Sequence, residues 1–373
     1  MKWVFWIAAG SVLYTYAGYA MWLRVRLLWR REPVRRGPFT PSVSIVMVVR
    51  NEEAILGKKL DNLLSLDYPP DQCQIVVVSD GSMDRTETIL RERAGDPRVH
   101  AVLNSLQGGK AAGLADALTW AQGEIVVFMD ARQKIEAGAV KRLMENFADP
   151  EVGCVSGELM LGDPDNGEAA RGTGLYWKME KKVREWESDS GSVVGATGAL
   201  YAARRELVPT VPAGTILDDV FIPMHVVRQG ARVVLDGRAR AWDVPSLGME
   251  REFGRKVRTL SGNYQLVRLA PWLLSGANPI RFEFISHKLM RLVAPFALAA
   301  ALVSPVFLTS PLYRAALVAQ VAFYALGILG MVPGKKGPFT RIADAASTFL
   351  MLNTAAVLAF ANFVTGRKEV WAR

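Results

Sequence analysis

The chain has 373 residues, of which 50% are hydrophobic and 22% are charged, and its formal net charge is +9. This apolar content excludes a disordered, collagen-like or low-complexity chain. The two cysteines, Cys73 and Cys154, are too few for a disulfide framework or a paired-cysteine zinc site, which favours a reduced, cytosol-facing domain.

The N-terminal segment predicts a membrane span. Residues Trp3–Leu23 carry no charge, and about 20 such residues cross the hydrocarbon core of a bilayer. A secretory signal peptide would have a shorter apolar stretch and small residues at a cleavage site. Arginines follow the segment at once, at positions 24, 26, 30, 31, 35 and 36. The positive-inside rule therefore predicts an external N-terminus, a basic cytoplasmic flank up to residue 37, and a cytoplasmic chain thereafter.

The C-terminal region, residues 291–373, is also apolar. Leu292–Tyr313 and Ala315–Gly334 each predict a span, joined by an outer turn near Pro311. The last apolar stretch, Ile342–Val364, is more polar and is followed by basic residues. It is either a packed or re-entrant helix with a cytoplasmic tail or a span that breaks the charge rule, and the first interpretation is favoured.

The middle of the chain, residues 38–250, predicts an α/β domain. Short runs rich in valine and isoleucine at Val43–Val49, Ile75–Val78 and Ile125–Met129 suit parallel strands covered on both faces. Amphipathic helical patterns begin near Leu114 and Val140. This alternation predicts a doubly wound sheet, in which ligands bind at the carboxyl ends of the strands.

Acidic side chains follow each of these strands, in segments 50–53, 79–84 and 130–132. One such carboxylate would most simply cap a helix, whereas three on one sheet edge favour a polar ligand site. Gly108-Gly109-Lys110 is followed by alanine, which excludes a nucleoside-triphosphate loop. The basic residues cluster beside the predicted spans, so we do not expect nucleic acid as a partner.

The order of motifs resembles a membrane-embedded family 2 glycosyltransferase, the group that includes the cellulose, chitin and hyaluronan synthases. Each motif is weak alone, and their shared order and spacing carry the resemblance over most of the chain. The motifs are Val-Val-Arg-Asn-Glu-Glu (48–53), Val-Ser-Asp-Gly-Ser-Met-Asp (78–84), Gly-Gly-Lys-Ala-Ala-Gly-Leu (108–114), Phe-Met-Asp-Ala-Arg (128–132), Gly-Ala-Thr-Gly-Ala-Leu (195–200) and Ile-Leu-Asp-Asp-Val (216–220).

The resemblance implies a GT-A-like, Rossmann-type catalytic domain with flanking transmembrane helices. It implies a nucleotide-sugar donor, usually a UDP-sugar, and a divalent cofactor, Mg²⁺ or Mn²⁺, bound by Asp130 of the D-x-D motif. By similarity, the donor-binding residues are Arg50, Asn51, Glu52, Asp80, Lys110, Asp130, Arg132 and Arg258.

The resemblance also matches Asp219 to the catalytic base, with adjacent Asp218 as the alternative. A positioned carboxylate is needed because the acceptor hydroxyl is a poor nucleophile, and attack opposite the leaving diphosphate would invert the anomeric centre. The two aspartates could also cap a helix, which does not exclude catalysis. Gly198, Glu158 and Arg255 are assigned to acceptor binding.

The sequence departs from the family pattern at two positions. Arg132 stands where the D-x-D motif has its second acid, which predicts weaker metal dependence, or a site completed by another carboxylate such as Glu158. Thr259 replaces a tryptophan that stacks on the acceptor sugar in processive synthases, so polymer synthesis is in doubt. The surrounding segment, within residues 251–290, predicts basic amphipathic helices in the membrane interface.

These features together predict an inverting glycosyltransferase in the inner (plasma) membrane, with its catalytic domain in the cytoplasm. The expected partners are a nucleotide-sugar donor, a saccharide or lipid-linked acceptor, and membrane lipid. Two alternatives remain open at this point: single-sugar transfer to a polyprenyl phosphate or another lipid, and a nucleotide-sugar-binding membrane protein without catalysis.

Overall fold

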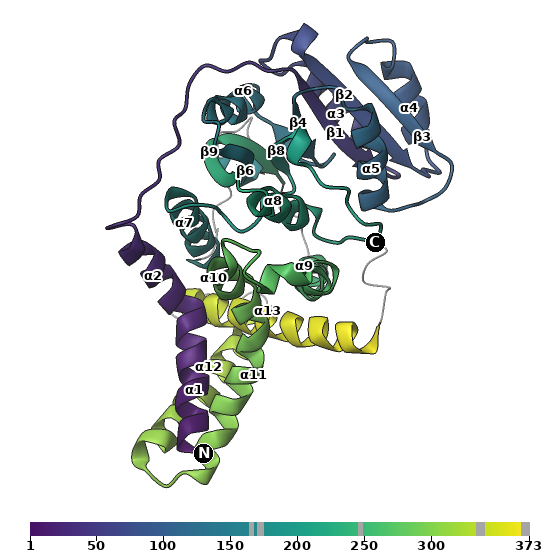
Figure 1. Ribbon diagram of the computed structural model, residues 1–373. Coiled ribbons are helices and arrows are strands. Elements are labelled where there is room, and N and C mark those ends of the chain that lie inside the picture. Colours follow the sequence, from purple (N-terminus) through teal and green to yellow (C-terminus); the bar gives the residue numbers. More distant parts are fainter. Residues whose placement is uncertain (164–167, 170–174, 245–248, 333–339, 367–373) are drawn as a thin grey trace.

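A computed structural model describes residues 1–163, 168–169, 175–244, 249–332 and 340–366 of the chain. An α/β domain lies above a bundle of long helices, and the N-terminus lies at the far end of that bundle (Figure 1). The bundle contains α1 (Lys2–Leu13), α11 (Met290–Val303) and α12 (Pro311–Gly330).

A nine-stranded mixed sheet forms the centre of the α/β domain, in the order β3-β2-β1-β4-β8-β6-β9-β5, with β7 paired to β6. The strands are β1 (Val43–Val49), β2 (Cys73–Asp80), β3 (Val99–Asn104), β4 (Ile125–Met129), β5 (Lys134–Ile135), β6 (Val152–Asp163), β7 (Glu168–Ala169), β8 (Leu200–Arg204) and β9 (Arg232–Asp243).

The three predicted strands are confirmed as β1, β2 and β4, which lie side by side and run parallel. The other half of the sheet differs from a purely parallel arrangement, because β8 pairs antiparallel with both β4 and β6. The carboxyl ends of β1, β2 and β4 consequently meet at one edge, where the predicted acidic segments follow them.

Alternating side chains of the strands form two cores, one on each face of the sheet. Ile45 and Ile75 pack with α3 (Leu56–Leu64) and α6 (Ala139–Glu145) on one face. Val46 and Val76 pack with α5 (Lys110–Trp120) and α8 (Asp218–Arg228) on the other. Helices on both faces confirm the predicted α/β class.

Three described helices are long and apolar enough to cross a membrane: Arg281–Phe307, Pro311–Gly330 and Ile342–Thr365. The N-terminal helix, which runs through a π-helical turn into α2 (Tyr19–Arg26), is not among them by this measure. It nevertheless packs against the first two of the three. Ala8 lies against Ala297 of the first, and the Phe5 ring meets the ring of Tyr313, in the second, edge-on at 5.1 Å.

The last helix, α13 (Thr340–Thr365), runs across the upper ends of the bundle helices, at the boundary with the α/β domain (Figure 1). Gly330 of α12 allows the two helices to touch, because a Cβ there would lie 2.4 Å from the Ala343 carbonyl oxygen. The rings of Tyr264, on α9 (Met249–Leu269), and Phe363 stack at 5.2 Å, so α13 also packs on α9.

A buried polar seam joins the helices to the α/β domain. In α7 (Leu175–Asp189), Glu187 accepts hydrogen bonds from the Tyr19 hydroxyl at 2.6 Å and is paired with His287 Nδ1 at 2.8 Å. Arg26 forms a buried ion pair with Glu283 and donates to the Ser190 carbonyl oxygen at 2.6 Å. Buried charges need such partners, so this seam fixes where the helices dock.

Gly123 provides a test of the sheet packing, because a Cβ at this position would lie 2.5 Å from the backbone nitrogen of Ser44. We expect Gly123→Ala to lower the free energy of unfolding by about 1–3 kcal/mol through this backbone clash. Gly57→Ala is the matched control, because Gly57 lies in α3 with open space around it and should gain about 0.5–1 kcal/mol from its higher helix propensity. Thermal unfolding in detergent measures both; equal midpoints would contradict the predicted clash.

Candidate active site

A lysine bridges two of the predicted acidic residues at the carboxyl edge of the sheet. Lys110 Nζ, at the first residue of α5, lies 3.0 Å from Asp130 Oδ1 and 3.3 Å from Asp218 Oδ2. Burial opposes the charged amine, but Asp218 and Asp130 outweigh it and raise the pKa of Lys110. The ammonium ion therefore holds the end of β4 and the start of α8 together.

Asp219, the next residue of α8, lies beside a glycine. A Cβ at Gly198 would lie 3.1 Å from Asp219 Oδ2, so the glycine leaves that oxygen approachable. The backbone of Asp219 is fixed because its carbonyl oxygen accepts a hydrogen bond from Ala196 N at 2.7 Å. The capping interpretation is not supported in the described part of the chain, since the N-cap of α8 is Leu217 and makes no side-chain cap hydrogen bond.

Burial and charge separate the roles of the two aspartates. Burial, with the neighbouring charge of Asp218, raises the pKa of Asp219 to about 6, against the opposing effect of Lys110. Asp218 is 4% exposed and is paired with Lys110, whereas Asp219 remains partly accessible. Asp219 is thus a carboxylate that can accept a proton near neutral pH, and Asp218 anchors the lysine.

Asp80, at the end of β2, orders the loop that carries Lys110. Its Oδ1 accepts a hydrogen bond from Gly108 N at 2.6 Å, and its Oδ2 accepts one from Gly109 N at 2.9 Å. Gly109 has a φ of 86°, which favours glycine. Asp80 therefore joins the same cluster as Asp130 and Asp219 through this loop.

The loops after β1 and β2 brace one another. Asn51 has a φ of 54° and its Oδ1 accepts a hydrogen bond from Met83 N at 2.8 Å. Glu53 Oε2 accepts one from Arg85 N at 2.9 Å. These hydrogen bonds account for Asn51 and Glu53 in the segment 50–53 as structural residues, whereas Arg50 is exposed.

Arg132 lies at this edge, but its charge is already paired. Its guanidinium donates a hydrogen bond to Asp243 at the end of β9. Burial raises the pKa of Glu52, and the charge of Arg132 partly offsets this, so the two side chains lie near each other. Arg132 is therefore less available to neutralise a diphosphate than the sequence suggested.

Lys59 was not predicted from the sequence. It lies on the apolar face of α3 beside Leu56 and Leu60, and its Nζ donates to the Gln133 carbonyl oxygen at 2.7 Å. Burial lowers its pKa to about 7, and Asp130 acts against this lowering. The sequence signal that could have identified Lys59 is a lysine on the same helix face as Leu56 and Leu60.

A second missed residue, Arg184 of α7, orders the segment next to Asp219. It donates to Thr197 Oγ1 at 2.7 Å and to Ser156 Oγ at 2.8 Å. Glu158, predicted to bind acceptor or metal, instead forms an ion pair with Lys181. The structure thus directs Glu158 toward α7.

The predicted residues Arg255 and Arg258 lie on α9. Arg255 pairs with Glu252 one turn away, and Arg258 is half-buried with interactions of its own. Thr259 is exposed and donates to the Arg255 carbonyl oxygen at 3.0 Å.

The described residues contain no group of three His, Cys, Asp or Glu side chains that could hold a metal ion. Asp130 alone, paired with Lys110, remains from the predicted D-x-D motif. Mg²⁺ is commonly held by one or two carboxylates together with substrate phosphates. The residues therefore fit a metal ion bound jointly by Asp130 and a diphosphate ligand, and they do not fit a site built by the protein alone.

Comparison with known proteins agrees with this geometry. Residues 44–211 match the model of the family "Glycosyl transferase family 2". This part of the chain is a glycosyl transferase family 2 domain, and it carries Lys110, Asp130 and Gly198.

The fold agrees with a solved glycosyltransferase. The chain is similar to the mannosyltransferase PcManGT from Pyrobaculum calidifontis, solved in complex with GDP-Man and Mn²⁺, with a TM-score of 0.73 and 23% identity over 98% of this chain and 99% of that one. The match confirms a GT-A-like α/β architecture.

Two curated relatives share parts of the sequence. The β-monoglucosyldiacylglycerol synthase of Synechocystis sp. is 28% identical over 50% of this chain and 40% of its own length. The poly-β-1,6-N-acetyl-D-glucosamine synthase of Staphylococcus epidermidis is 21% identical over 72% of this chain and 64% of its own length. The match thus covers less than two thirds of either relative.

The buried charge of Asp219 predicts a stability effect that depends on pH. The pKa of Asp219 in the folded state, about 6, lies above the ordinary value of 3.8. Ionisation of Asp219 therefore destabilises the folded state. This destabilisation is complete above about pH 6 and absent below about pH 4. We expect Asp219→Asn to gain on the order of 1–2 kcal/mol at pH 7.5 and nothing at pH 4. Thermal midpoints in detergent at the two pH values measure this, and a pH-independent difference would contradict it.

Proposed function

We propose that the chain is an inverting hexosyltransferase of family 2, which transfers a sugar from a nucleotide-sugar donor, usually a UDP-sugar in this family, to a saccharide or lipid-linked acceptor. The observation that carries the proposal is the Lys110 bridge between Asp130 and Asp218, with Asp219 approachable beside Gly198. A cation among acids suits a diphosphate site, and a free carboxylate next to it suits a base.

In the proposed reaction, the acceptor hydroxyl gives its proton to Asp219 and its oxygen attacks the anomeric carbon of the donor. The bond from that carbon to the diphosphate oxygen breaks on the opposite face, and the nucleoside diphosphate leaves with the electron pair. Attack opposite the leaving group inverts the anomeric configuration. The loop held by Asp80 would keep Lys110 near the diphosphate.

We further propose Mg²⁺ or Mn²⁺ as cofactor, held by Asp130 and the donor. When bound, the ion would neutralise the charge that gathers on the leaving diphosphate. The pairing of Arg132 with Asp243 supports this over a mechanism in which arginine replaces the metal. The mannosyltransferase of similar fold was solved with Mn²⁺.

The proposed location is the inner (plasma) membrane, with the α/β domain at the cytoplasmic face. The apolar helices Arg281–Phe307 and Pro311–Gly330 and the arginine-rich segment from Arg24 to Arg36 support it. If α1, α11 and α12 cross the bilayer, the N-terminus lies outside and α13 lies along the cytoplasmic surface, as its crosswise direction in Figure 1 suggests.

The acceptor side supports transfer of one or a few sugars over processive synthesis. Thr259 is small and exposed, so it offers no aromatic face on which an acceptor sugar would stack. The curated relatives include both a glycolipid synthase and a polymer synthase.

The central test is incubation of membranes with a panel of radiolabelled nucleotide sugars, followed by sizing and organic extraction of the product. We expect transfer with one donor, and loss of about 10²-fold or more in Asp219→Asn because the base is removed. The wild-type rate should rise with pH and level off above about 6, following the pKa of Asp219.

The same variant separates catalysis from binding alone. Asp219→Asn should bind the donor with unchanged affinity, since Lys110 and Asp130 are intact. If the wild-type protein binds a nucleotide sugar but turns over none of the panel with any membrane extract, the chain is a binding protein and the proposal fails.

Metal dependence is tested by chelation. We expect EDTA to abolish transfer and either Mg²⁺ or Mn²⁺ to restore it, because one carboxylate and the donor share the ion. Asp130→Asn should raise the metal concentration needed for half-maximal rate. Asp71→Asn is the control, because Asp71 lies at the opposite, amino end of β2. Full activity in EDTA would favour the arginine mechanism.

A further inference from the structure

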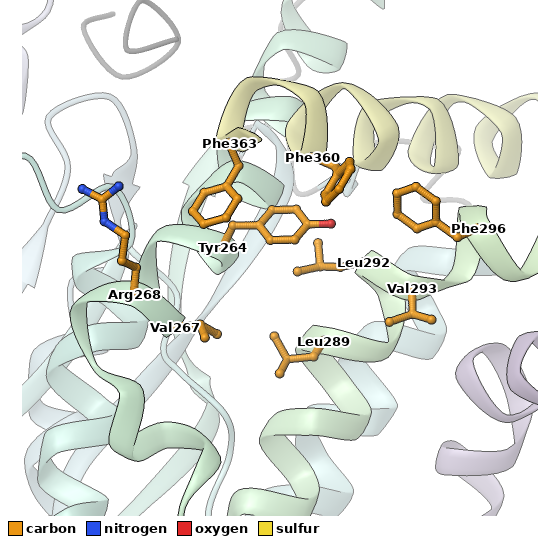
Figure 2. A pocket seen from close by; sticks show the side chains of 9 residues that line it. All are labelled: Tyr264, Val267, Arg268, Leu289, Leu292, Val293, Phe296, Phe360 and Phe363. Atoms are coloured by element: carbon orange, nitrogen blue, oxygen red, sulfur yellow. The ribbon is translucent and has the colours of Figure 1, made fainter. Parts of the chain in front are cut away.

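An apolar pocket of 540 Å³ lies on the side of α9 that faces the bundle, between α9, α11 and α13. Tyr264, Phe360 and Phe363 form one wall, and Leu289 and Val293 form the other (Figure 2). Among the described lining residues only Arg268 is charged, and its guanidinium points away from the aromatic cluster (Figure 2). Two of the helices that form it, α11 and α13, belong to candidate membrane spans.

The pocket is connected to the active site through two elements. On η7 (Ile285–Leu289), Leu289 lines the pocket, and the preceding residue, Lys288, interacts electrostatically with both Asp219 and Glu180. On α9, Gln265 accepts a hydrogen bond from Ile216 N at 2.9 Å, and Ile216 lies two residues before Asp218. Val267, two residues after Gln265, lines the pocket.

A buried polar atom lies on α9 one helical turn before the pocket residue Val267. Asn263 is 4% exposed, and its Oδ1 has no hydrogen-bond partner among the described residues. It precedes Val267 by one helical turn and therefore shares its face of α9. An unpaired buried acceptor is costly, and a hydroxyl group would satisfy it.

We propose that this pocket holds the hydrocarbon chain of a neutral lipid alcohol of the diacylglycerol class, whose free hydroxyl is the sugar acceptor. The inference rests on the proposed function and specifies its acceptor. The apolar lining and the membrane-facing helices suit an acyl chain, and Asn263 offers a hydrogen bond to its head group.

The charges at the site favour an alcohol over a phosphate acceptor. Asp130, Asp218 and Asp219 are gathered there, and Lys110 is already paired with two of them. Lys288, which precedes the pocket residue Leu289, interacts electrostatically with Glu180 as well as with Asp219. A phosphate acceptor would add a further negative charge and would need no base, whereas an alcohol adds no charge and requires one.

The test uses the full-length protein in phosphatidylcholine nanodiscs with a diacylglycerol that carries a photoreactive diazirine on its acyl chain. We expect crosslinks in peptides containing residues 289–296 and 360–363. Unlabelled diacylglycerol should reduce the crosslinks at least tenfold, and added phosphatidylcholine should not.

A matched pair of variants tests whether the lipid chain binds in this pocket. Val293→Trp fills the pocket from a residue that is 48% exposed and should reduce crosslinking at least tenfold. Val318→Trp, at a residue 68% exposed on α12, should leave it unchanged. Equal effects of both variants, labelling spread over all membrane helices, equal competition by phosphatidylcholine, or competition only by a polyprenyl phosphate would each overturn the proposal.

Crosslinking does not depend on sugar transfer, so the two proposals can fail separately. Binding of a nucleotide sugar, measured on the same nanodiscs, should be unaffected by Val293→Trp. Specific crosslinking without any nucleotide-sugar binding would refute the proposed function. Nucleotide-sugar turnover that yields only water-soluble product, with diacylglycerol present, would refute the lipid acceptor alone.

Discussion

The site depends on one half-buried cation, Lys110, held between carboxylates. Lys110 lies 3.0 Å from Asp130 and 3.3 Å from Asp218, and without it three acidic side chains would be gathered at one sheet edge with little compensation. Like charges so close would raise the pKa of at least one of them, and the pKa of Asp219 is raised even with the lysine present. The lysine thus permits a dense acidic cluster, and Asp219 keeps the proton affinity that a base requires.

Much of this arrangement could be predicted from local sequence. The strands at Val43–Val49 and Ile125–Met129 have the predicted bounds, because buried parallel strands are continuous apolar runs. Asp80 and Asp130 follow neighbouring parallel strands, so they lie at one sheet edge. The Lys110 loop links them to Asp218 and Asp219 at the start of α8. Contacts between distant segments could not be predicted in this way. The partner of Arg132 is Asp243, at the end of a strand more than a hundred residues later, and no local pattern links the two.

Local sequence was equally insufficient to predict how the candidate membrane helices pack. Composition identified the apolar stretches, but the direction of α13 follows from packing, since Gly330 admits Ala343 and the ring of Tyr264 stacks on Phe363. The apolar helix that was predicted to begin at Leu292 begins at Arg281. It can include Glu283 and His287 because partners in α2 and α7 bury and pair these side chains. Charged residues within an apolar helix are affordable where another element neutralises them.

This neutralisation connects the candidate membrane helices to the proposed active site. In α7, Glu180 and Glu187 hold His287, which precedes Lys288, and Arg184 on the same helix orders Thr197 beside Asp219. One helix of the α/β domain therefore fixes both the segment that bounds the apolar pocket and the segment beside Asp219. A soluble enzyme needs no such arrangement, because its acceptor diffuses in from water. If the acceptor is anchored by a hydrocarbon chain as proposed, it can reach the proposed base only at a fixed height above the bilayer. Rigid docking of the domain on its helices would then help to align the reactants.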